Sequence, residues 1–443
     1  MIATDQRASL QERRTVMRLL ADYVLVGTEL VAAAAIDIDP DGRIAAVGSV
    51  AELGETSGQV RQLGGLLMPG LVNAHAHTPM TLVRSAGDGL PLQQWLTDGV
   101  WPREFQMTTE DAGWGMRLGW AEMLRCGVTT TCEMYLHESA VVEATIESGG
   151  RLVVTPGVIA ALAPDGKLDG RLGEITDFHR AHHRPGQGIS VGFGPHSLYD
   201  LSPEQVGEIG VCARELDALL HIHLEETSYE RDDVINKWTG RTATELLADI
   251  GVLEGRVLGA HGVWLSDSDQ KLLGQAGAAV AHCPISNLKL GSGIAPVVDM
   301  IANGITVGVG TDGVASNDDL DLWQELKLTP LLASGSSLDP QAMSAATALE
   351  LATVRAAKAI GLDDVGRLQA GWWADIIRVD LDQPAFTPGI ETDLLTSLVF
   401  AGSSEFVTDV WVAGRQVVDD GVCTTIDLDV AMHHAREIGN RIA

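Results

Sequence analysis

Apolar segments alternate with amphipathic segments through the middle of the chain, and this alternation constrains the fold more than any other feature. The expected strands are residues 71–77, 127–133, 151–158, 189–195, 219–223, 256–261, 278–282 and 305–312. Strands that alternate with helices form parallel sheets, and eight such repeats favour a closed (β/α)8 TIM-type barrel over an open doubly wound sheet. A Gly-x-Gly-x-x-Gly motif between a strand and a helix is absent, which argues against a dinucleotide-binding fold.

The two ends of the chain have a different pattern. Residues 17–67 and 369–425 contain short apolar strands separated by Gly, Asp and Pro turns. The simplest arrangement joins both ends into one small composite β-domain beside the barrel at residues 68–368, and two unrelated terminal β-meanders are the alternative. We expect residues 1–16 to form a flexible extension and residues 426–443 to form a helix that packs on the barrel.

The composition excludes several classes of partner. The net charge is −30, and no cluster of Lys and Arg is seen of the kind that nucleic acids or anionic membranes require. The five cysteines are scattered without a Cys-x-x-Cys motif, which is typical of a reduced, cytoplasmic chain. No apolar run approaches the ~20 residues of a membrane span, and the first residues lack the apolar core of a signal peptide. We therefore expect a cytoplasmic protein, and we expect it to form a homo-oligomer.

Two His-x-His pairs lie at the ends of expected strands. His75 and His77 close the first strand, and His221 and His223 close the fifth. Because residues i and i+2 of a strand point to the same side, each pair can present two imidazoles to one metal ion. An isolated pair is as often exposed to solvent, and spacing alone does not rank His221 against His223. The location of both pairs at the carboxyl ends of barrel strands, where such barrels carry their active sites, favours a metal site.

Three further side chains complete this expected site. His261 follows the sixth strand, Asp312 closes the eighth, and Glu226 lies three residues after His223. Three neutral imidazoles and one carboxylate leave an open position for water on a single ion, which lowers the pKa of that water to about 7. Asp312 can bind the metal and accept the water proton, while Glu226 can carry a proton to a departing nitrogen. His261 is expected to polarise the attacked centre or to hold the hydroxide. Glu226 favours His223 over His221 as the ligand.

Five motifs spread through most of the chain carry a resemblance to a known family. They are PGLVNAHAHTPM (69–80), GFGPH (192–196), HIHLEET (221–227), HCPISNLKLGSGIAP (282–296) and GVGTDGVASN (308–317). The chain resembles the amidohydrolase superfamily in its mononuclear-metal deaminase branch, and more narrowly the methylthioadenosine/S-adenosylhomocysteine deaminases, with chlorohydrolase-like enzymes nearby. The resemblance implies a barrel with a composite β-domain and a zinc-type ion. The ligands that it implies are His75, His77, His223 and Asp312. It also implies that Glu226 is the proton shuttle and that His261 lies beside the metal-bound water.

The resemblance extends to residues that contact the substrate. The Trp-Pro-x-Glu element that the family has after strand 1 matches Trp101 and Glu104, which implies that Trp101 lines the base site and Glu104 takes the ribose hydroxyls. Arg171 and His196 match positions that contact the nucleoside. The chain departs from the family after strand 3. Enzymes of the family that accept S-adenosylhomocysteine can anchor its amino-acid tail there with an Arg, where our alignment places Pro156. A smaller 5′-modified adenosine, or another aminated heterocycle, is therefore expected.

The sequence thus predicts a metal-dependent hydrolytic deaminase that releases ammonia from adenosine or a 5′-modified adenosine such as methylthioadenosine. The cofactor is expected to be one divalent ion, Zn²⁺, with Fe²⁺ as the alternative. A deaminase of a free base, a pterin or a triazine, and a hydrolytic dechlorinase, are the alternatives within the branch. Glu226 favours ammonia as the leaving group, because an amine needs protonation and chloride does not. A binuclear cyclic-amide hydrolase would need a carboxylated Lys at the end of strand 4, and residues 189–196 contain no Lys.

Overall fold

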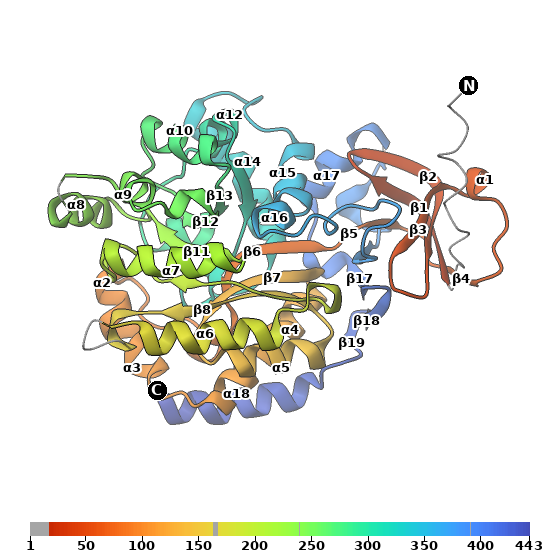
Figure 1. Ribbon diagram of the computed structural model, residues 1–443. Coiled ribbons are helices and arrows are strands. Elements are labelled where there is room, and N and C mark those ends of the chain that lie inside the picture. Colours follow the sequence, from red (N-terminus) through yellow and green to blue (C-terminus); the bar gives the residue numbers. More distant parts are fainter. Residues whose placement is uncertain (1–16, 163–166, 239, 390) are drawn as a thin grey trace, which may run out of the picture.

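The computed structural model describes residues 17–162, 167–238, 240–389 and 391–443. It contains a β/α barrel and a smaller β-domain that lies at one side of the barrel (Figure 1). The flexible extension expected at residues 1–16 lies outside the described residues. None of the helices in the described part of the chain has the length and apolar character that crossing a bilayer requires.

Eight strand positions form the barrel, as the alternation in the sequence predicts. The strands are β6 (Leu71–His77), β7 (Val128–Tyr135), β8 (Arg151–Val158), β9 (Ile189–Val191), β10 (Gly194–Pro195), β11 (Leu219–Leu224), β12 (Arg256–His261), β13 (Ala279–His282), β14 (Thr306–Val309) and β15 (Asp312–Gly313). Two positions are interrupted, since β9 and β10 share the fourth and β14 and β15 share the eighth. The neighbouring barrel strands pair in parallel, and β15 pairs with β6, so that the first and eighth positions meet. The predicted TIM-type barrel is confirmed.

Glycines allow the interrupted strands to approach their neighbours. Gly192 lies between β9 and β10, and a Cβ atom there would lie 2.4 Å from the carbonyl oxygen of Leu219. Gly310 lies between β14 and β15, and a Cβ atom there would lie 2.7 Å from the backbone nitrogen of His75. No side chain fits at such distances unless the backbone moves. Gly310 thus lets the eighth strand position lie directly against β6, two residues before Asp312.

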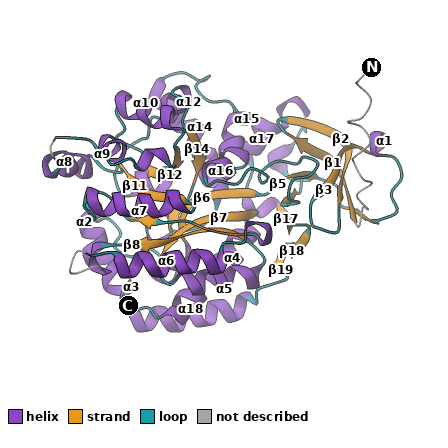
Figure 2. Cartoon of the chain, in the orientation of Figure 1, coloured by secondary structure: helices purple, strands orange, loops and turns teal. Residues whose placement is uncertain are grey.

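Helices cover the outside of the barrel (Figure 2). They are α4 (Thr109–Arg125), α5 (Glu138–Ser148), α6 (Asp169–His182), α7 (Pro203–Glu215), α9 (Ala243–Asp249), α10 (Asp267–Ala276), α12 (Val297–Ala302), α14 (Leu322–Ser337), α15 (Ala345–Leu351), α16 (Val354–Ala359), α17 (Leu394–Ala401) and α18 (Leu428–Ile442). Local signals in the sequence fix several of their first turns. Thr108 and Asp111 form a reciprocal capping box at the start of α4, and Ser202 and Gln205 do the same for α7.

Short helical segments follow several barrel strands at their carboxyl ends and form the mouth of the barrel. They are η1 (Thr78–Val83), α2 (Leu92–Gln94), η2 (Trp95–Val100), α3 (Trp101–Glu104), η3 (Ala160–Leu162), α8 (Ser228–Lys237), α11 (Pro284–Lys289) and α13 (Val314–Asn317). Two single turns, η4 (Pro185–Gln187) and η5 (Val252–Glu254), precede β9 and β12 instead. The long connection from β6 to α4 therefore carries more irregular structure than the other connections near the site.

Strands from both ends of the chain build the β-domain. They are β1 (Met17–Val26), β2 (Glu29–Ile38), β3 (Ile44–Ser49), β4 (Gln59–Gln62), β5 (Leu66–Pro69), β16 (Ile376–Val379), β17 (Val407–Val412), β18 (Arg415–Asp419) and β19 (Val422–Cys423). Short helical turns accompany them: α1 (Val50–Leu53), η6 (Pro384–Phe386), η7 (Glu391–Asp393) and η8 (Ser404–Phe406). The antiparallel pairing of β5 with β16 joins the two halves of the sheet, which runs β19-β18-β17-β16-β5-β1-β2-β3 with β4 beside β1. The composite β-domain is confirmed, and two separate meanders are not formed.

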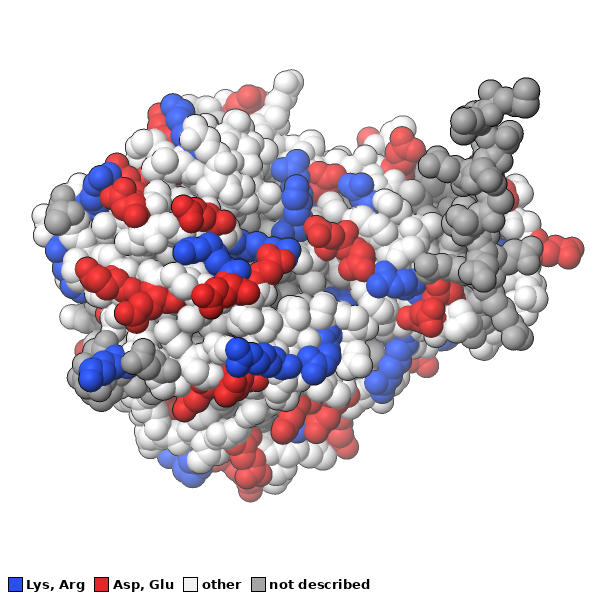
Figure 3. All heavy atoms as spheres, viewed as in Figure 1, with Lys and Arg blue, Asp and Glu red and all other residues white. Residues whose placement is uncertain are grey.

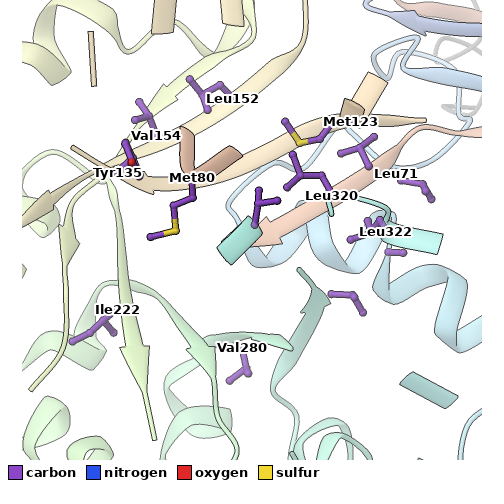
Figure 4. Packing of buried hydrophobic residues seen from close by; sticks show 14 of the residues in the cluster. Leu71, Met80, Met123, Tyr135, Leu152, Val154, Ile222, Val280, Leu320 and Leu322 are labelled. Atoms are coloured by element: carbon purple, nitrogen blue, oxygen red, sulfur yellow. The ribbon is translucent and has the colours of Figure 1, made fainter. Parts of the chain in front are cut away.

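Apolar side chains and one buried ion pair hold these parts together. Figure 4 shows part of the largest apolar cluster. Barrel strands contribute residues such as Ile222 and Val280, and the segment after β6 contributes Met80. Arg151 in β8 pairs with Asp375, just before β16, at 2.8 Å, and both side chains are almost fully buried. Removing one partner of such a pair typically costs about 3–5 kcal/mol. This contact therefore fixes the barrel against the β-domain.

The surface carries charges of both signs. On the face seen in Figure 3, acidic and basic side chains are interspersed and separated by uncharged surface. The large excess of acidic residues in the whole chain, 60 Asp and Glu against 30 Lys and Arg, favours solubility rather than a particular fold.

Candidate active site

The four predicted metal ligands meet at the carboxyl ends of the barrel strands. His75 and His77 lie at the end of β6, His223 lies near the end of β11, and Asp312 begins β15. One ligand atom from each residue lies within 4.8 Å of the others. Oδ1 of Asp312 lies 3.2 Å from Nε2 of His75 and 3.4 Å from Nε2 of His77. Nε2 of His77 lies 3.2 Å from Nε2 of His223. The ligand atoms of the four residues therefore converge on one small volume.

The Nε2 atom of His75 tests whether this cluster fits a metal ion. The atom is buried and forms no hydrogen bond. A buried polar atom without a partner is rare and needs an explanation, such as an ion at that place. Three imidazole nitrogens and one carboxylate oxygen are also the donor set of a mononuclear site with an open position for water. The residues fit the group, and the chain has a His/His/His/Asp metal site.

Backbone carbonyls hold two of the three histidine ligands. Nδ1 of His77 lies 2.5 Å from the carbonyl oxygen of Met134, and Nδ1 of His223 lies 2.9 Å from that of His196. A carbonyl oxygen only accepts, so each Nδ1 carries the proton and donates it. Nε2 of both rings is then free to bind a metal, and the direction of each ring is fixed.

Two hydroxyl groups hold the carboxylate ligand. Ser286 and Ser316 donate hydrogen bonds to Oδ2 of Asp312 at 2.6 and 2.9 Å. Oδ1 is left to face the histidines. Burial alone would raise the pKa of Asp312, but the neighbouring histidines, with His75 contributing most, hold that pKa well below its usual range. The ligand is thus an ionised carboxylate with one oxygen committed to the protein and one directed at the metal site.

Burial favours the neutral form of two of the histidine ligands, His75 and His223. Burial lowers the pKa of His75 to about 4, an effect that Asp312 only partly opposes. Burial, followed by the charge of His196, also lowers the pKa of His223 well below its usual value. A neutral imidazole is the form that binds metals. The electrostatics of the site therefore prepare these side chains for an ion.

Glu226 and His261 lie beside the ligands and face the same cavity. Burial, followed by the negative charge of Asp312, raises the pKa of Glu226 well above its usual value. Its Oε2 atom lies 3.8 Å from Nε2 of His261. Nδ1 of His261 lies 2.9 Å from Oδ1 of Asn287, so that this ring nitrogen donates and the direction of the ring is fixed. The cavity thus contains a buried carboxyl group, whose surroundings favour the protonated form, next to the imidazole of His261.

The backbone bends sharply where these side chains leave their strands. Glu225, His261 and Asp312 have φ angles of 51°, 75° and 64°, in the left-handed region that side chains other than Gly rarely adopt. Such residues cost on the order of 1–3 kcal/mol each and cluster at functional sites. The side chain of Glu225 accepts a hydrogen bond from the backbone nitrogen of Ala243 at 3.1 Å, away from the cavity. The turn at Glu225 thus separates the two consecutive glutamates and directs Glu226 over the metal ligands.

A cavity of about 890 Å³, including the part open to solvent, extends from the metal ligands to the mouth of the barrel. Most of its wall is apolar. The apolar residues that line it are Met80, Leu92, Trp95, Leu96, Trp101, Phe105, Met107, Met134, Leu136, Ile159 and Leu290. No Lys or Arg lines it among the residues that the structure describes. Its size suits a small ligand that combines apolar surface with a few polar groups.

The predicted substrate contacts divide into two groups. Trp101, Glu104 and His196 line the cavity, and their roles remain predictions. Arg171 does not line it, because its guanidinium pairs with Glu138 at 2.9 Å. Sequence reasoning could not foresee this ion pair, since its two partners belong to different barrel helices.

Several residues that shape the site were not predicted. Tyr135 donates a hydrogen bond to Oε1 of Glu104 at 2.6 Å, and burial raises the pKa of that carboxyl group. Ser286 and Asn287 belong to the fourth of the five motifs and Ser316 to the fifth. Their presence inside these motifs was the available signal. The contact between Tyr135 and Glu104 has no such signal, because it joins two segments 31 residues apart.

Comparisons with known proteins agree with this geometry. A model of the amidohydrolase family matches residues 66–417. The chain is 40% identical over 365 residues to a 5-methylthioadenosine/S-adenosylhomocysteine deaminase of Moorella thermoacetica, which covers 82% of this chain and 84% of that protein. It is 35% identical over 434 residues to a 5′-deoxyadenosine deaminase of Methanopyrus kandleri, which covers 96% and 99%.

Solved structures share the whole fold. The crystal structure of an adenosine deaminase from Xanthomonas campestris with bound zinc superposes with a TM-score of 0.89 at 30% identity and covers 97% of this chain and 99% of that one. An atrazine chlorohydrolase variant from Arthrobacter aurescens, complexed with zinc and atraton, has a TM-score of 0.87 at 24% identity and covers 96% and 100%. That second likeness concerns the fold alone. The family predicted from the motifs is confirmed, and the chain belongs to the amidohydrolase family.

Proposed function

We propose that the protein is a metal-dependent hydrolytic deaminase that converts 5′-modified adenosines to the corresponding inosines and releases ammonia. The observation that carries this proposal is the position of Glu226, a buried carboxyl group with a raised pKa, beside the His/His/His/Asp site, because a departing amine needs a proton donor there. The names of the two relatives described above support the substrate class. Adenosine itself and other 5′-substituted nucleosides belong to the same class.

Each polar side chain of the site has a separate task in this reaction. His75, His77, His223 and Asp312 would hold one divalent ion. A bound ion of this kind supplies hydroxide at neutral pH, because it lowers the pKa of a coordinated water to about 7. The ionised carboxylate of Asp312 can accept a proton from the attacking water. Glu226 donates its proton to a ring nitrogen of the substrate, takes up the proton that the added hydroxyl group gives up, and passes it to the departing nitrogen; the proton that Asp312 accepted then returns to Glu226. His261, which lies beside Glu226, can polarise the attacked centre or hold the hydroxide.

The apolar wall supports a neutral substituent at the 5′ end of the substrate. In our assignment, Glu104 takes the ribose hydroxyls, and Trp101 and His196 contact the nucleoside. The remaining wall offers no Lys or Arg among the described residues, and Arg171 is paired with Glu138. A carboxylate-bearing tail would lose its hydration there without gaining a cation. We therefore propose methylthioadenosine, 5′-deoxyadenosine or adenosine as better substrates than S-adenosylhomocysteine.

Zinc is the ion that we propose, at one per chain. The donor set suits it, and the adenosine deaminase that shares this fold at 30% identity was solved with zinc bound. The expected cytoplasmic location and homo-oligomer are also part of the proposal. The five cysteines are unpaired, which supports a reducing compartment.

An ammonia-release screen tests the proposed function. The panel contains adenosine, methylthioadenosine, 5′-deoxyadenosine, S-adenosylhomocysteine, guanine, cytosine, a pterin and an aminotriazine, and the metal content is measured on the same sample. Ammonia from the adenosine derivatives, with about one ion per chain, is the expected result. Ammonia release from only the free bases, the pterin or the triazine would show that the substrate is one of these compounds and not a nucleoside. Chloride release from a chlorotriazine without any deamination would favour the dechlorinase alternative.

A further inference from the structure

A histidine outside the four-ligand cluster contacts His75 on the side of its ring that faces away from the metal site. His221 is fully buried in β11, two residues before the ligand His223, and it is not one of the four converging ligands. Its Nε2 atom lies 2.8 Å from Nδ1 of His75. Its Nδ1 atom lies 3.1 Å from the hydroxyl oxygen of Thr155 in β8. Both nitrogens of this second imidazole are therefore engaged inside the barrel.

Thr155, His221 and His75 form a chain of hydrogen bonds, and the hydroxyl group of Thr155 decides which atom donates in each of them. The hydroxyl group of Thr155 donates its single proton to the backbone carbonyl oxygen of Glu133, at 3.0 Å. Towards His221 this hydroxyl can then only accept, so Nδ1 of His221 carries a proton and donates it. Nε2 of His221 is left as an acceptor, and Nδ1 of His75 must donate to it. The sulfur of Cys132, 3.7 Å from Nδ1 of His221, is a weaker second neighbour of the same nitrogen.

If the hydrogen bond between His221 and His75 had the opposite donor, His75 could not bind a metal. If His221 donated to Nδ1 of His75, the proton of the His75 ring would lie on Nε2. That nitrogen faces Oδ1 of Asp312 at 3.2 Å and is the one available for the ion. A ring nitrogen that carries a proton cannot bind a metal. The direction imposed from Thr155 is thus the one that leaves Nε2 of His75 free.

We propose that His221 is a positioning residue that sets the tautomer and the orientation of His75 for metal binding, with Thr155 as its anchor. The proposal rests on the metal-dependent reaction proposed above, but it concerns metal affinity and not turnover. His77 and His223 receive the equivalent support from backbone carbonyls of Met134 and His196, which no substitution of a side chain removes. Among the three imidazole ligands, His75 therefore depends on another side chain for its orientation.

Four variants separate the effect of the hydrogen bonds of His221 from the effect of its packing in the barrel. His221→Phe keeps a ring but offers no acceptor to His75. His221→Gln keeps an acceptor for His75 and a donor for Thr155. Thr155→Val removes the anchor with little change in volume, and Thr155→Ser keeps it. Zinc affinity is measured on the metal-free proteins by competition with a chromophoric chelator, and the thermal midpoint of each metal-free protein is recorded beside it.

We expect zinc affinity to fall by about 10–100-fold in His221→Phe, the range found when the outer partner of a metal-bound histidine is lost. Thr155→Val should show a smaller loss, while His221→Gln and Thr155→Ser stay near the wild type, with similar thermal midpoints for all metal-free proteins. Unchanged affinity in His221→Phe, or equal losses in Thr155→Val and Thr155→Ser, would overturn the proposal. If His221→Phe does not fold, the Thr155 pair decides. Failure of the deaminase assignment would leave these affinities, and therefore the test, intact.

Discussion

The two ends of the cavity are built in different ways. At the metal end, the ligands lie on barrel strands, and a hydrogen bond holds each of them on the side that faces away from the metal site. His77 and His223 donate to backbone carbonyls, Asp312 accepts from serine hydroxyls, and His75 contacts the imidazole of His221. At the mouth, the segments η1 to α3 after β6 supply a large part of the wall, the connections after β7, β8 and β10 supply more of it, and apolar side chains predominate. The barrel strands thus carry the residues of the chemistry, while substrate choice depends on the connections that follow these strands. Substitutions should have large effects at the metal end and graded ones at the mouth.

The largest effect is expected at Asp312. Asp312→Asn removes the charge that balances the ion and should abolish both bound metal and activity, and His75→Ala should do the same. Metal content by elemental analysis and ammonia release are measured on the same preparations. Wild-type enzyme should contain about one divalent ion per chain, and two ions per active chain would contradict a mononuclear centre.

The next effect separates chemistry from binding at the same end. Glu226→Gln removes the dissociable proton but keeps the shape of the side chain. We expect kcat to fall by ~10² or more, the scale of general acid–base catalysis, while zinc content and substrate affinity stay close to the wild type. Glu225→Gln is the matched control, because Glu225 faces Ala243 and not the cavity. Near-normal turnover in Glu226→Gln would exclude the proton-donor role.

These two predictions concern the metal end of the cavity, where the sequence predicted the structure most completely. The eight strand positions follow from alternating periodicity, and the ligands follow from their places at strand ends. His221 and His223 could not be ranked, because residues two apart share a face and differ only in depth along the strand. The structure places His223 among the four converging ligands and His221 one level deeper in the barrel, where it contacts His75. Depth in the barrel depends on how the strands are staggered, which local sequence does not encode.

The mouth was less predictable for a physical reason. Trp101 and Glu104 were found through a motif, and the structure places both in the wall of the cavity. Their surroundings depend on contacts between segments that are distant in sequence, such as the hydrogen bond from Tyr135 to Glu104. Arg171 shows the same limit, since its pairing with Glu138 became visible only once α5 and α6 were packed.

Substrate choice at the mouth gives the third prediction. The efficiency kcat/KM for methylthioadenosine or 5′-deoxyadenosine should exceed that for S-adenosylhomocysteine by about tenfold or more, which is about 1.4 kcal/mol, because no cation among the described wall residues meets the tail. Ile159→Arg, which adds a cation to the wall, should narrow this ratio, and Ile159→Leu should leave it unchanged. Equal efficiency of the wild type on all three substrates would refute the tail argument.

A smaller effect is expected from Tyr135, which contacts Glu104 rather than the reacting atoms. Tyr135→Phe removes one hydrogen bond of 2.6 Å to a buried carboxyl group. Such a bond contributes about 1 kcal/mol net, so KM for a ribonucleoside should rise about fivefold with kcat nearly unchanged. The same variant should leave KM for 2′,3′-dideoxyadenosine unaffected, because that substrate lacks the 2′ and 3′ hydroxyls that Glu104 is proposed to bind. Equal increases for both substrates would instead indicate a general loss of packing in the wall.

The smallest effect is a change in stability, and it is expected where the C-terminal helix α18 packs beside the mouth of the barrel. Arg441 in α18 pairs with Asp111 in α4 at 2.5 Å and also donates a hydrogen bond to the backbone carbonyl of Gln106, just after α3, at 3.4 Å. Burial opposes ionisation of Asp111, but Arg441 and the capping contacts of Thr108 together lower its pKa below the usual 3.8.

A group whose folded-state pKa is lowered stabilises the fold above its unfolded pKa, and this stabilisation is lost as the pH falls through the folded value. Arg441→Gln should therefore reduce the free energy of unfolding by about 0.5 kcal/mol at pH 7, as expected for a half-exposed ion pair. The difference should persist down to about pH 5 and shrink below the unfolded pKa of about 3.9. Urea unfolding at each pH measures it, and Arg441→Lys, which keeps the charge, is the control. A difference that does not change with pH would assign the effect to the contact with Gln106, and the support of the mouth by α18 would then be independent of charge.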